Sequence, residues 1–320
     1  MEKVGSGNYD GFSSNSETYL AASEYDAPRG YCVRFYSDYL SFTEYAKHEE
    51  SGRTRCVLAF GAEGVAPEPV VPDYSTAALG DIMLSDGNLV KPGAITESQK
   101  AQAVGVVAYL YKDQTRVGEA VKTKLDRDAK GLVLALKNAS SDGIAWSTNT
   151  TETVGDIYDQ FGQAYANSYD GYSVTQSVFG KGDITSTYPA FAAVQTFQTS
   201  TPAPAATTGW YMPSIGEWAD LLSDEGGLGG VDISTLKNTT EEFVVDIRGA
   251  QTTAINGLNT AMDKVGADNY DSFITSLHYW FASENSSVDA YSTYFSTSEL
   301  SFSYGHKANA THRVRCVLAF

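Results

Sequence analysis

The chain has 320 residues, a formal net charge of −17 and 42% hydrophobic residues, which is enough for one large folded domain or two ordinary ones. Nucleic acids and anionic membrane surfaces are recognised through clusters of Lys and Arg, so this acidic balance excludes both as expected partners. No apolar run approaches the length that spans a bilayer, so no membrane insertion is expected.

The chain begins with a sequence that it repeats at its end. Residues 3–60 and 264–320 both contain Leu-Ser-Phe, and both close on Arg-x-Arg-Cys-Val-Leu-Ala-Phe. An internal repeat of this kind indicates one structural unit encoded twice. The predicted organisation is a partial repeat (1–60), a Pro-rich linker (61–76) and a main domain (77–320) that ends in the second copy.

The two copies differ in a selective way. Their shared residues are mostly of the types that fill a core or pair in strands. Their differing residues change size, charge and polarity, which a packed core position tolerates only at a cost of several kcal/mol. The shared positions include Tyr19/Tyr279, Glu24/Glu284, Tyr31/Tyr291, Phe35/Phe295 and Lys47/Lys307, and the changed ones include Cys32/Ser292, Arg34/Tyr294, Tyr36/Ser296, Glu44/Tyr304 and Tyr45/Gly305. The sequence therefore predicts a fixed scaffold that exposes a replaceable face.

The main domain opens with strands. Asp86-Gly87 lies between two short apolar segments and predicts a tight hairpin. The continuous apolar runs at 103–111 and 131–136 predict buried central strands, and residues 144–146 are expected to extend the same sheet. An antiparallel set of four further strands is expected at 279–283, 290–295, 300–304 and 314–320.

Two to three helices follow the central strands. One is predicted at 189–198, and a second begins at Ser214, because Ser214 with Glu217 three residues later forms a capping box. A third is predicted near 252–265. Residues 150–188 have mixed periodicity and are expected to be irregular, with one helix near 154–166. The fold class is thus α+β with antiparallel sheets.

The residues that carry chemistry show no recognisable catalytic spacing. The odd number of cysteines (Cys32, Cys56 and Cys316) and their apolar neighbours predict buried free thiols, and no metal-binding spacing is present. Acid–base chemistry could come from His278, His306 and His312 with Glu284, Asp289 and Glu299. No nucleophile–base pair accompanies them, so the sequence predicts neither an enzyme nor a cofactor, and an oxidase or hydrolase remains the alternative.

Several motifs together resemble the C-type-lectin-fold family, and more narrowly its formylglycine-generating, sulfatase-modifying type and the variable proteins of diversity-generating retroelements. They are GDI-x-x-SDG, AVGVVAYLY, GWYMPSIGEW, YWFASE and RVRCVLAF. The resemblance implies a C-type-lectin-like domain over 77–320 whose last fifty residues hold the ligand-contacting positions. Calcium motifs of sugar-binding lectins (Glu-Pro-Asn, Gln-Pro-Asp, Trp-Asn-Asp) are absent, and so is the late Cys pair of the oxidase relatives.

Transferred residue by residue, the resemblance implies a set of ligand-binding positions in the terminal segment. Their residue types are the amphipathic aromatics and small hydrogen-bonding residues that adaptable binding surfaces use. The set is Asn285, Ser286, Ser287, Asp289, Ser292, Tyr294, Ser296, Ser298, Tyr304, His306, Asn309 and His312.

The expected function is therefore non-enzymatic binding or adhesion. The expected partner is a surface receptor, protein or glycan, and the expected location is extracellular, at a cell surface or on a virion. The alternative is a structural subunit of a surface appendage or virion, in which the same face mediates assembly, as a homo-oligomer or through packing of the repeated units. An incomplete unit would leave strand edges unpaired, so residues 1–60 are expected to pair with the main domain or with another chain.

Overall fold

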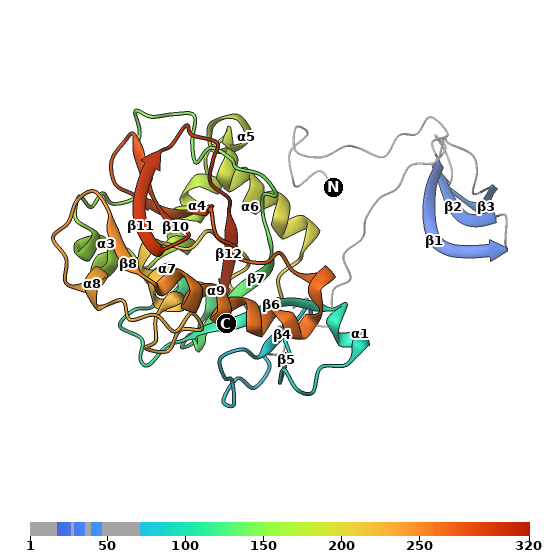
Figure 1. Cartoon of the computed structure of the whole chain (residues 1–320). Helices are drawn as coiled ribbons and strands as arrows, with labels where there is room; N and C mark the ends of the chain where they lie inside the picture. Colours follow the sequence, from blue (N-terminus) through green and yellow to red (C-terminus); the bar gives the residue numbers. More distant parts are fainter. Residues whose placement is uncertain (1–17, 27–28, 36–39, 47–70) are drawn as a thin grey trace. The chain divides into compact units, whose positions relative to one another are not determined.

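The computed structural model describes the backbone of residues 18–26, 29–35 and 40–46, and all atoms of residues 71–320. The chain divides into two compact units, Met1–Glu68 and Pro69–Phe320. The fold class is α+β with antiparallel sheets, as predicted (Figure 1). None of the helices in the described part of the chain has the length and apolarity needed to cross a membrane.

A five-stranded antiparallel sheet lies at the base of the second unit, in the order β12-β7-β6-β4-β5. Its central strands β6 and β7 are the two continuous apolar runs, and their buried residues confirm the prediction. The predicted hairpin is also present, with Met83 paired to Leu89 and Gly87 at a φ of +91° in the turn. The strands are β4 Ile82–Leu84, β5 Leu89–Val90, β6 Ala103–Leu110, β7 Gly131–Asn138 and β12 Arg315–Ala319.

A second, four-stranded antiparallel sheet has the order β8-β11-β10-β9. Its strands are β8 Val245–Arg248, β9 Leu277–Glu284, β10 Asp289–Phe295 and β11 Glu299–His306. The last strand of the chain was expected in this set, which is wrong: β12 pairs with β7 in the other sheet. Residues 144–146 do not extend the five-stranded sheet either, because Ile144 forms only an isolated bridge with His312.

The described residues contain nine α-helices, more than the two to three predicted. The capping box is confirmed: the Ser214 hydroxyl accepts from the Glu217 N–H, and the Glu217 carboxylate accepts from the Ser214 N–H at 2.8 Å. The helix expected at 154–166 spans only 161–167, because Val154 and Gly155 donate their N–H groups to Glu284 instead. The helices are α1 Glu97–Lys100, α2 Glu119–Leu125, α3 Phe161–Asn167, α4 Gly171–Phe179, α5 Ile184–Thr187, α6 Pro189–Ser200, α7 Ile215–Leu222, α8 Ser234–Lys237 and α9 Ala250–Met262.

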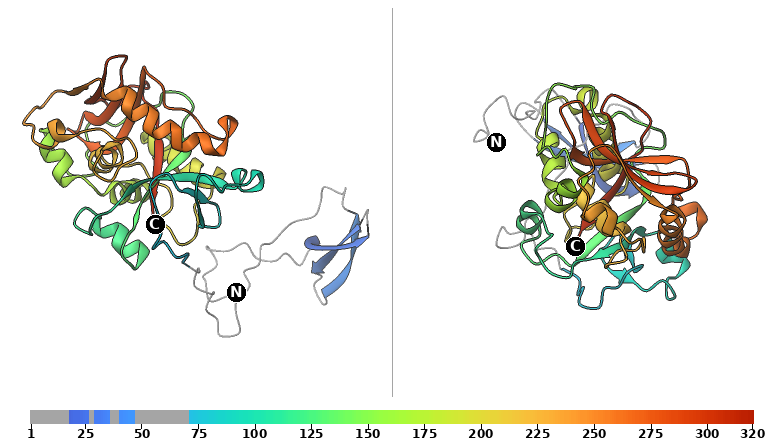
Figure 2. Two further views of the ribbon diagram at one scale, coloured as in Figure 1. Left: turned by 60° about the horizontal axis from the view of Figure 1, so that its bottom comes forward. Right: turned by 60° about the vertical axis from the view of Figure 1, so that its left-hand side comes forward.

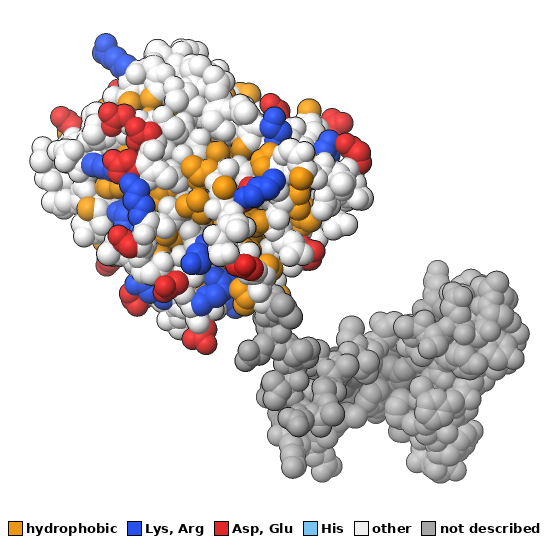
Figure 3. Space-filling view, turned by 90° about the horizontal axis from the view of Figure 1, so that it is seen from below, with side chains coloured by type: hydrophobic (Ala, Val, Ile, Leu, Met, Phe, Trp, Pro, Cys, Tyr) orange, Lys and Arg blue, Asp and Glu red, His pale blue; other side chains and the backbone are white. Residues whose placement is uncertain are grey.

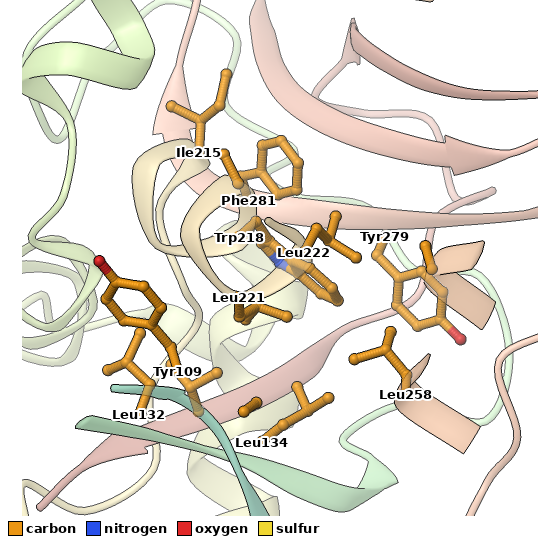
Figure 4. Close-up of a cluster of buried hydrophobic side chains, with 14 of the residues drawn as sticks. Tyr109, Leu132, Leu134, Ile215, Trp218, Leu221, Leu222, Leu258, Tyr279 and Phe281 are labelled. Carbon is orange, nitrogen blue, oxygen red and sulfur yellow. The ribbon is translucent and has the colours of Figure 1, made fainter. Parts of the chain in front are cut away.

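The main core lies between the two sheets and is centred on α7. Trp218 of this helix is fully buried, with its ring 5.9 Å from that of Phe281 and 5.8 Å from that of Tyr279 on β9. Figure 4 shows these rings above Leu132 and Leu134 of β7. The helix α9, orange in Figure 2, packs beside β8, β11 and β6 and contributes Leu258 and Met262 to the same core. The side chains of one face of the four-stranded sheet therefore belong to this core.

The surface of the second unit is chemically mixed. In the view of Figure 3, acidic and basic side chains are interspersed around hydrophobic ones. A shallow hollow lined by Leu79, Pro92, Leu228 and Ala261 lies beside α9.

The first unit is an antiparallel sheet in the order β1-β2-β3, with β1 Thr18–Asp26, β2 Arg29–Phe35 and β3 Leu40–Ala46. Its register reproduces that of β9, β10 and β11 when 260 is added to each residue number. Phe35 pairs with Leu40 as Phe295 pairs with Leu300, and the irregularity in β1–β2 recurs in β9–β10. The sequence repeat is therefore also a repeat of backbone structure.

Candidate functional site

The four-stranded sheet has a second face, opposite the main core. Because side chains alternate along a strand, Tyr291 and Phe295 of β10 point into the core, whereas Ser292 and Tyr294 point the other way. Cross-strand pairing then places Trp280 and His278 of β9 beside them. We call this side of the sheet the outer face, and its residues are His278, Trp280, Ser292, Tyr294, Ser301, Ser303 and Gly305, with His312 packed onto it from the segment before β12. Part of it is covered, because Trp280 belongs to a second buried hydrophobic cluster.

Four rings form a continuous row on the outer face. His312 stacks on Trp280 with ring centroids 3.8 Å apart and planes inclined by 12°. His278 stacks on Tyr294 at 4.0 Å and 9°, and the two histidine rings are 4.7 Å apart. Trp280 is fully buried and donates from Nε1 to the Ile144 carbonyl at 2.8 Å, whereas Tyr294 is only half-buried. The row therefore leads from the interior to solvent.

Burial disfavours the charged form of both histidines of the row. Burial, with a smaller effect of the neighbouring His278, lowers the pKa of His312 to about 3. Burial also lowers the pKa of His278. The Nδ1 atom of His278 is buried and has no hydrogen-bond partner among the described residues. Neutral rings can stack closely without the cost of burying a charge.

The rings of Trp280 and His312 leave little space beside them, so small residues occupy the neighbouring positions of the outer face. A Cβ atom added at Gly305 would lie 3.2 Å from the Trp280 ring and 3.2 Å from the His312 ring. Ser292 and Ser303 are hydrogen-bonded through their hydroxyl groups at 3.2 Å. The arrangement of large and small side chains on this face is therefore interdependent.

The predicted binding residues fall into four groups. Ser292, Tyr294 and His312 meet on the outer face, and Tyr304 lies on the opposite, core-facing side, where it is paired with Tyr291. One end of the sheet carries Asn285, Ser286, Ser287, Asp289, His306 and Asn309, and the other end carries Ser296 and Ser298. The structure therefore does not bring the twelve residues into one site.

Burial separates the predicted residues further. Ser292, Ser296 and His312 are 0, 7 and 6% exposed, so the expectation that exchanged positions project into solvent does not hold for them. The Ser296 hydroxyl caps its turn by accepting from the Glu299 N–H at 2.9 Å. Asn285 donates from Nδ2 to the Tyr158 carbonyl at 3.2 Å. These side chains hold loops as well as line a surface.

A buried ion pair anchors the terminal segment. Lys307 and Glu284 are in direct contact, and both side chains are 0% exposed. Lys307 Nζ also donates to the Ser287 carbonyl at 2.9 Å, and Glu284 Oε2 accepts from the Val154 and Gly155 N–H groups at 2.6 and 2.8 Å. The pair thus joins β9, the segment after β11 and the loop before α3.

The sequence analysis did not assign the ion pair, although a signal was present. Glu24 and Lys47 repeat both of its residues. The Glu24 side chain and all of Lys47 lie outside the described residues. Removing one partner of a buried pair is strongly unfavourable, which explains why both copies keep the two residues together.

Shared positions are commoner on the core-facing side of the sheet than on the outer face. The core-facing positions 279, 291, 295, 300 and 302 are identical in the first copy, although Phe281, Thr293 and Tyr304 are replaced there by Ala, Val and Glu. Of the outer-face residues, Ser301 is kept and the other seven change. The outer-face exchanges, first copy to second, are Thr18/His278, Leu20/Trp280, Cys32/Ser292, Arg34/Tyr294, Thr43/Ser303, Tyr45/Gly305 and Gly52/His312.

The exchanges on the outer face compensate for one another in size. The second copy combines the large Trp280 and His312 with Gly305, and the first copy combines Leu20 and Gly52 with Tyr45. Trp280, His312 and Gly305 are in contact in the structure. Strand alternation combined with the repeat would have added Trp280 and Ser303 to the candidate residues and would have placed Gly305, already noted as exchanged, on the same face.

The second unit contains two further features that resemble sites. A polar hollow of about 410 Å³ lies between α4, the 154–156 loop and β9. Its buried polar groups have partners: Ser168 and Ser283 share a hydrogen bond at 2.6 Å, and Asp170 accepts from the Ser173 N–H at 2.9 Å. Among the described residues no group of His, Cys, Asp and Glu is arranged to hold a metal ion.

The second feature that resembles a site is the buried carboxyl group of Glu217. Burial raises its pKa to about 7, a value typical of general acids and bases. It is 1% exposed and accepts hydrogen bonds from Tyr211 at 2.7 Å and from the N–H groups of Ser214 and Gly171. These contacts assign Glu217 to the start of α7 and leave it no access to a substrate.

Comparisons with known proteins give one result that bears on the fold. A scan against protein-family models finds no match, and a search of curated proteins finds none. The chain is similar to a solved structure, the crystal structure of a fimbrial protein from Bacteroides ovatus ATCC 8483, with a TM-score of 0.52 and 20% sequence identity. The likeness covers 91% of this chain but 57% of that protein. At this identity it shows a shared fold.

Proposed function

We propose that this protein is a non-enzymatic binding protein of a cell surface, whose outer face recognises a receptor, protein or glycan. The observation that carries the proposal is the separation of the exchanges between the two copies. Seven of the eight outer-face positions change, whereas the buried ion pair and five of the eight core-facing positions are kept. A protein can bind different ligands with one fold when the residues of one face vary and the residues that hold the fold together are kept.

The proposal includes a type of fold and a source of the exchanges. We propose a C-type-lectin-like domain related to the variable proteins of diversity-generating retroelements. Support comes from the motifs in the sequence and from the position of Ser292, Tyr294 and His312 on a single face of the terminal sheet.

The chemistry of the outer face suits adaptable recognition. Tyr294 presents one ring face to His278, and its half-buried side chain reaches the surface. Tyr offers a large contact area at low cost in conformational entropy, and the hydroxyls of Ser301 and Ser303 lie on the neighbouring strand. The outer face is therefore suited to a partner that contacts it chiefly through the half-buried Tyr294 ring.

The second candidate function is a structural subunit of a surface appendage. The likeness to a fimbrial protein favours it, because it gives the two chains a common fold. In that case the same outer face would contact a neighbouring subunit. Both functions place the protein at a cell surface.

A matched pair of tyrosine variants tests the proposal. Tyr294→Ala removes the half-buried ring of the outer face, and Tyr304→Ala removes the same side chain from the opposite face of the adjacent strand. Binding is measured on a glycan array and on a panel of immobilised receptor ectodomains, and assembly by light scattering. Tyr294→Ala should abolish binding, whereas Tyr304→Ala should retain it.

The two candidate functions predict different results for Tyr294→Ala. Loss of ligand binding with unchanged assembly supports recognition. Loss of assembly alone supports the structural subunit. Equal binding by both variants and the unmodified protein would contradict a role for the outer face.

A further inference from the structure

The two edges of the four-stranded sheet differ. At the β9 edge the backbone is covered, because the Trp280 N–H donates to the Arg313 carbonyl at 3.0 Å. At the other edge β8 pairs with β11 and, among the described residues, with no further strand. Helix α8 packs beside β8 (Figure 1), and Val245 at the start of the strand is buried. The accessible part of this edge therefore runs from Asp246 to Arg248, and we call it the β8 edge.

The backbone of the β8 edge presents hydrogen-bonding groups to solvent. Gly249, directly after β8, donates its N–H to the Ser298 carbonyl at 2.8 Å. Because backbone groups alternate in direction along a strand, those of Ile247 also face β11, whereas those of Asp246 and Arg248 point away from the sheet. Within the described part of the chain, no group outside the sheet bonds to these N–H and C=O groups. Such an edge can pair with a further strand.

The side chains at the β8 edge combine opposite charges with apolar surface. Asp246 and Arg248 are both exposed, and neither forms an ion pair with a described residue. Ile247 between them is half-buried against the main core. Phe243 and Val244, which directly precede β8, are 72 and 42% exposed. Exposed apolar side chains that gather in one place are typical of an interaction surface.

We propose that the β8 edge pairs with the β8 edge of a second copy of this chain. The two strands run antiparallel about a twofold axis that passes between their Ile247 residues. Asp246 of each copy then lies opposite Arg248 of the other, and each such pair exchanges both of its N–H···O bonds and forms an ion pair. The two Ile247 side chains meet on the core side of the joint sheet, in a pair without mutual hydrogen bonds, where side chains are closest.

The charges of the β8 edge select both this register and this partner. A shift by two residues would place Asp246 opposite Asp246 or Arg248 opposite Arg248, and like charges directly opposite each other destabilise a strand pair. A shift by one residue would turn the N–H and C=O groups of one strand away from the other. The β8 edge is thus complementary to itself, as the interface of a twofold dimer must be.

The dimer presents two outer faces together. The twofold axis is perpendicular to the sheet, so both outer faces lie on the same side of a joint sheet. The two β10 strands are separated by β11, β8 and their counterparts, which places the two Tyr294 residues about 24 Å apart at the usual strand spacing. A pair of faces at a fixed spacing binds a repetitive surface with higher avidity than one face. This consequence rests on the proposed function, whereas the pairing of the β8 edges does not.

Charge reversal tests the pairing in the full chain, with no ligand present. Asp246→Arg places arginine opposite arginine, and Arg248→Asp places aspartate opposite aspartate, so each single variant should lose the dimer that the unmodified protein forms. The double variant D246R/R248D restores opposite charges and should dimerise again. A mixture of the two single variants should form a mixed dimer. Sedimentation velocity over a range of protein concentrations measures the mass, and circular dichroism checks that these changes at exposed positions leave the fold intact.

A cross-link tests the register. In Ile247→Cys the new thiols of two copies face each other in a pair whose Cα atoms are about 4.5 Å apart, within the range of a disulfide. Oxidation should join position 247 of one copy to position 247 of another, as peptide mapping identifies, and adding Asp246→Arg should abolish this product.

Three results would overturn the proposal. The first is an unmodified protein that stays monomeric at every concentration. The second is a dimer that Asp246→Arg leaves intact, because the contact would then lie elsewhere on the chain. The third is a dimer of Ile247→Cys that forms no 247–247 disulfide, because its strands would not pair in this register. Binding by the outer face is not measured in any of these experiments, so their failure leaves the proposed function standing.

Discussion

The size compensation on the outer face makes a quantitative prediction. In the double variant Trp280→Leu, Gly305→Tyr, two outer-face residues of the second copy are replaced by those of the first. Trp280→Leu removes a fully buried indole, its stacking on His312 and its hydrogen bond to Ile144. By comparison with other large-to-small core changes it should lower the free energy of unfolding by about 3 kcal/mol.

Gly305→Tyr alone should also destabilise the protein. Even a Cβ atom at 305 would be 3.2 Å from the rings of Trp280 and His312, so a whole tyrosine would displace them. Overpacking of this kind costs about 1–3 kcal/mol. If the two changes acted independently, the double variant would lose about 5 kcal/mol.

We expect the double variant to lose about 2 kcal/mol less than this sum, because the tyrosine would fill the space left by the indole. The assay is urea unfolding of all four proteins followed by circular dichroism, since removal of a tryptophan alters the fluorescence signal. Adding His312→Gly as the third exchange should recover more of the lost free energy of unfolding. A double variant that loses as much as the sum, or more, would refute the view that these positions change as a coupled set.

Two further predictions concern buried charge. Lys307→Met should lower the free energy of unfolding by about 3–5 kcal/mol in urea titrations, because it leaves the Glu284 carboxylate buried without its partner, and adding Glu284→Gln should recover part of the loss. His312 has a pKa of about 3 in the folded protein and about 6.5 when unfolded, so between these values only the unfolded state binds the proton. The contribution of His312 to the free energy of unfolding should therefore be fully present above pH 6.5 and fall towards pH 3 by up to about 1.4 kcal/mol per pH unit. The variant His312→Gln should reduce this slope. An unchanged slope in that variant would assign the acid sensitivity to other groups.

The sequence predicted the local structure well where the signals were local. The apolar runs of β6 and β7, the Asp86-Gly87 turn and the Ser214 capping box each depend on residues within a few positions of one another. The position of β12 was not predictable in this way. Its pairing with β7 is a long-range contact, and the apolar sequence of β12 is equally compatible with either sheet.

The candidate site could be predicted in part. The comparison of the copies and the resemblance together predicted Ser292, Tyr294 and His312 as binding residues, but the comparison assumed that exchangeable positions are exposed. The structure shows that exchange also occurs at buried positions, when neighbours such as Trp280 and Gly305 change with them. A single sequence gives no contacts between strands, so this coupling was not visible until the strands were paired.

The burial of the ring row has a consequence for how the outer face can vary. A ligand can touch Tyr294, yet the orientation of Tyr294 depends on His278, which contacts His312, which stacks on the buried Trp280. A change at the interior end of the row therefore alters the surface end without any new exposed residue. The two copies agree with this reasoning, because they differ at all four positions of the row. If the outer face is diversified as we propose, the diversity would be organised as sets of mutually fitted side chains, and the buried Glu284–Lys307 pair would hold the strands together while the sets change.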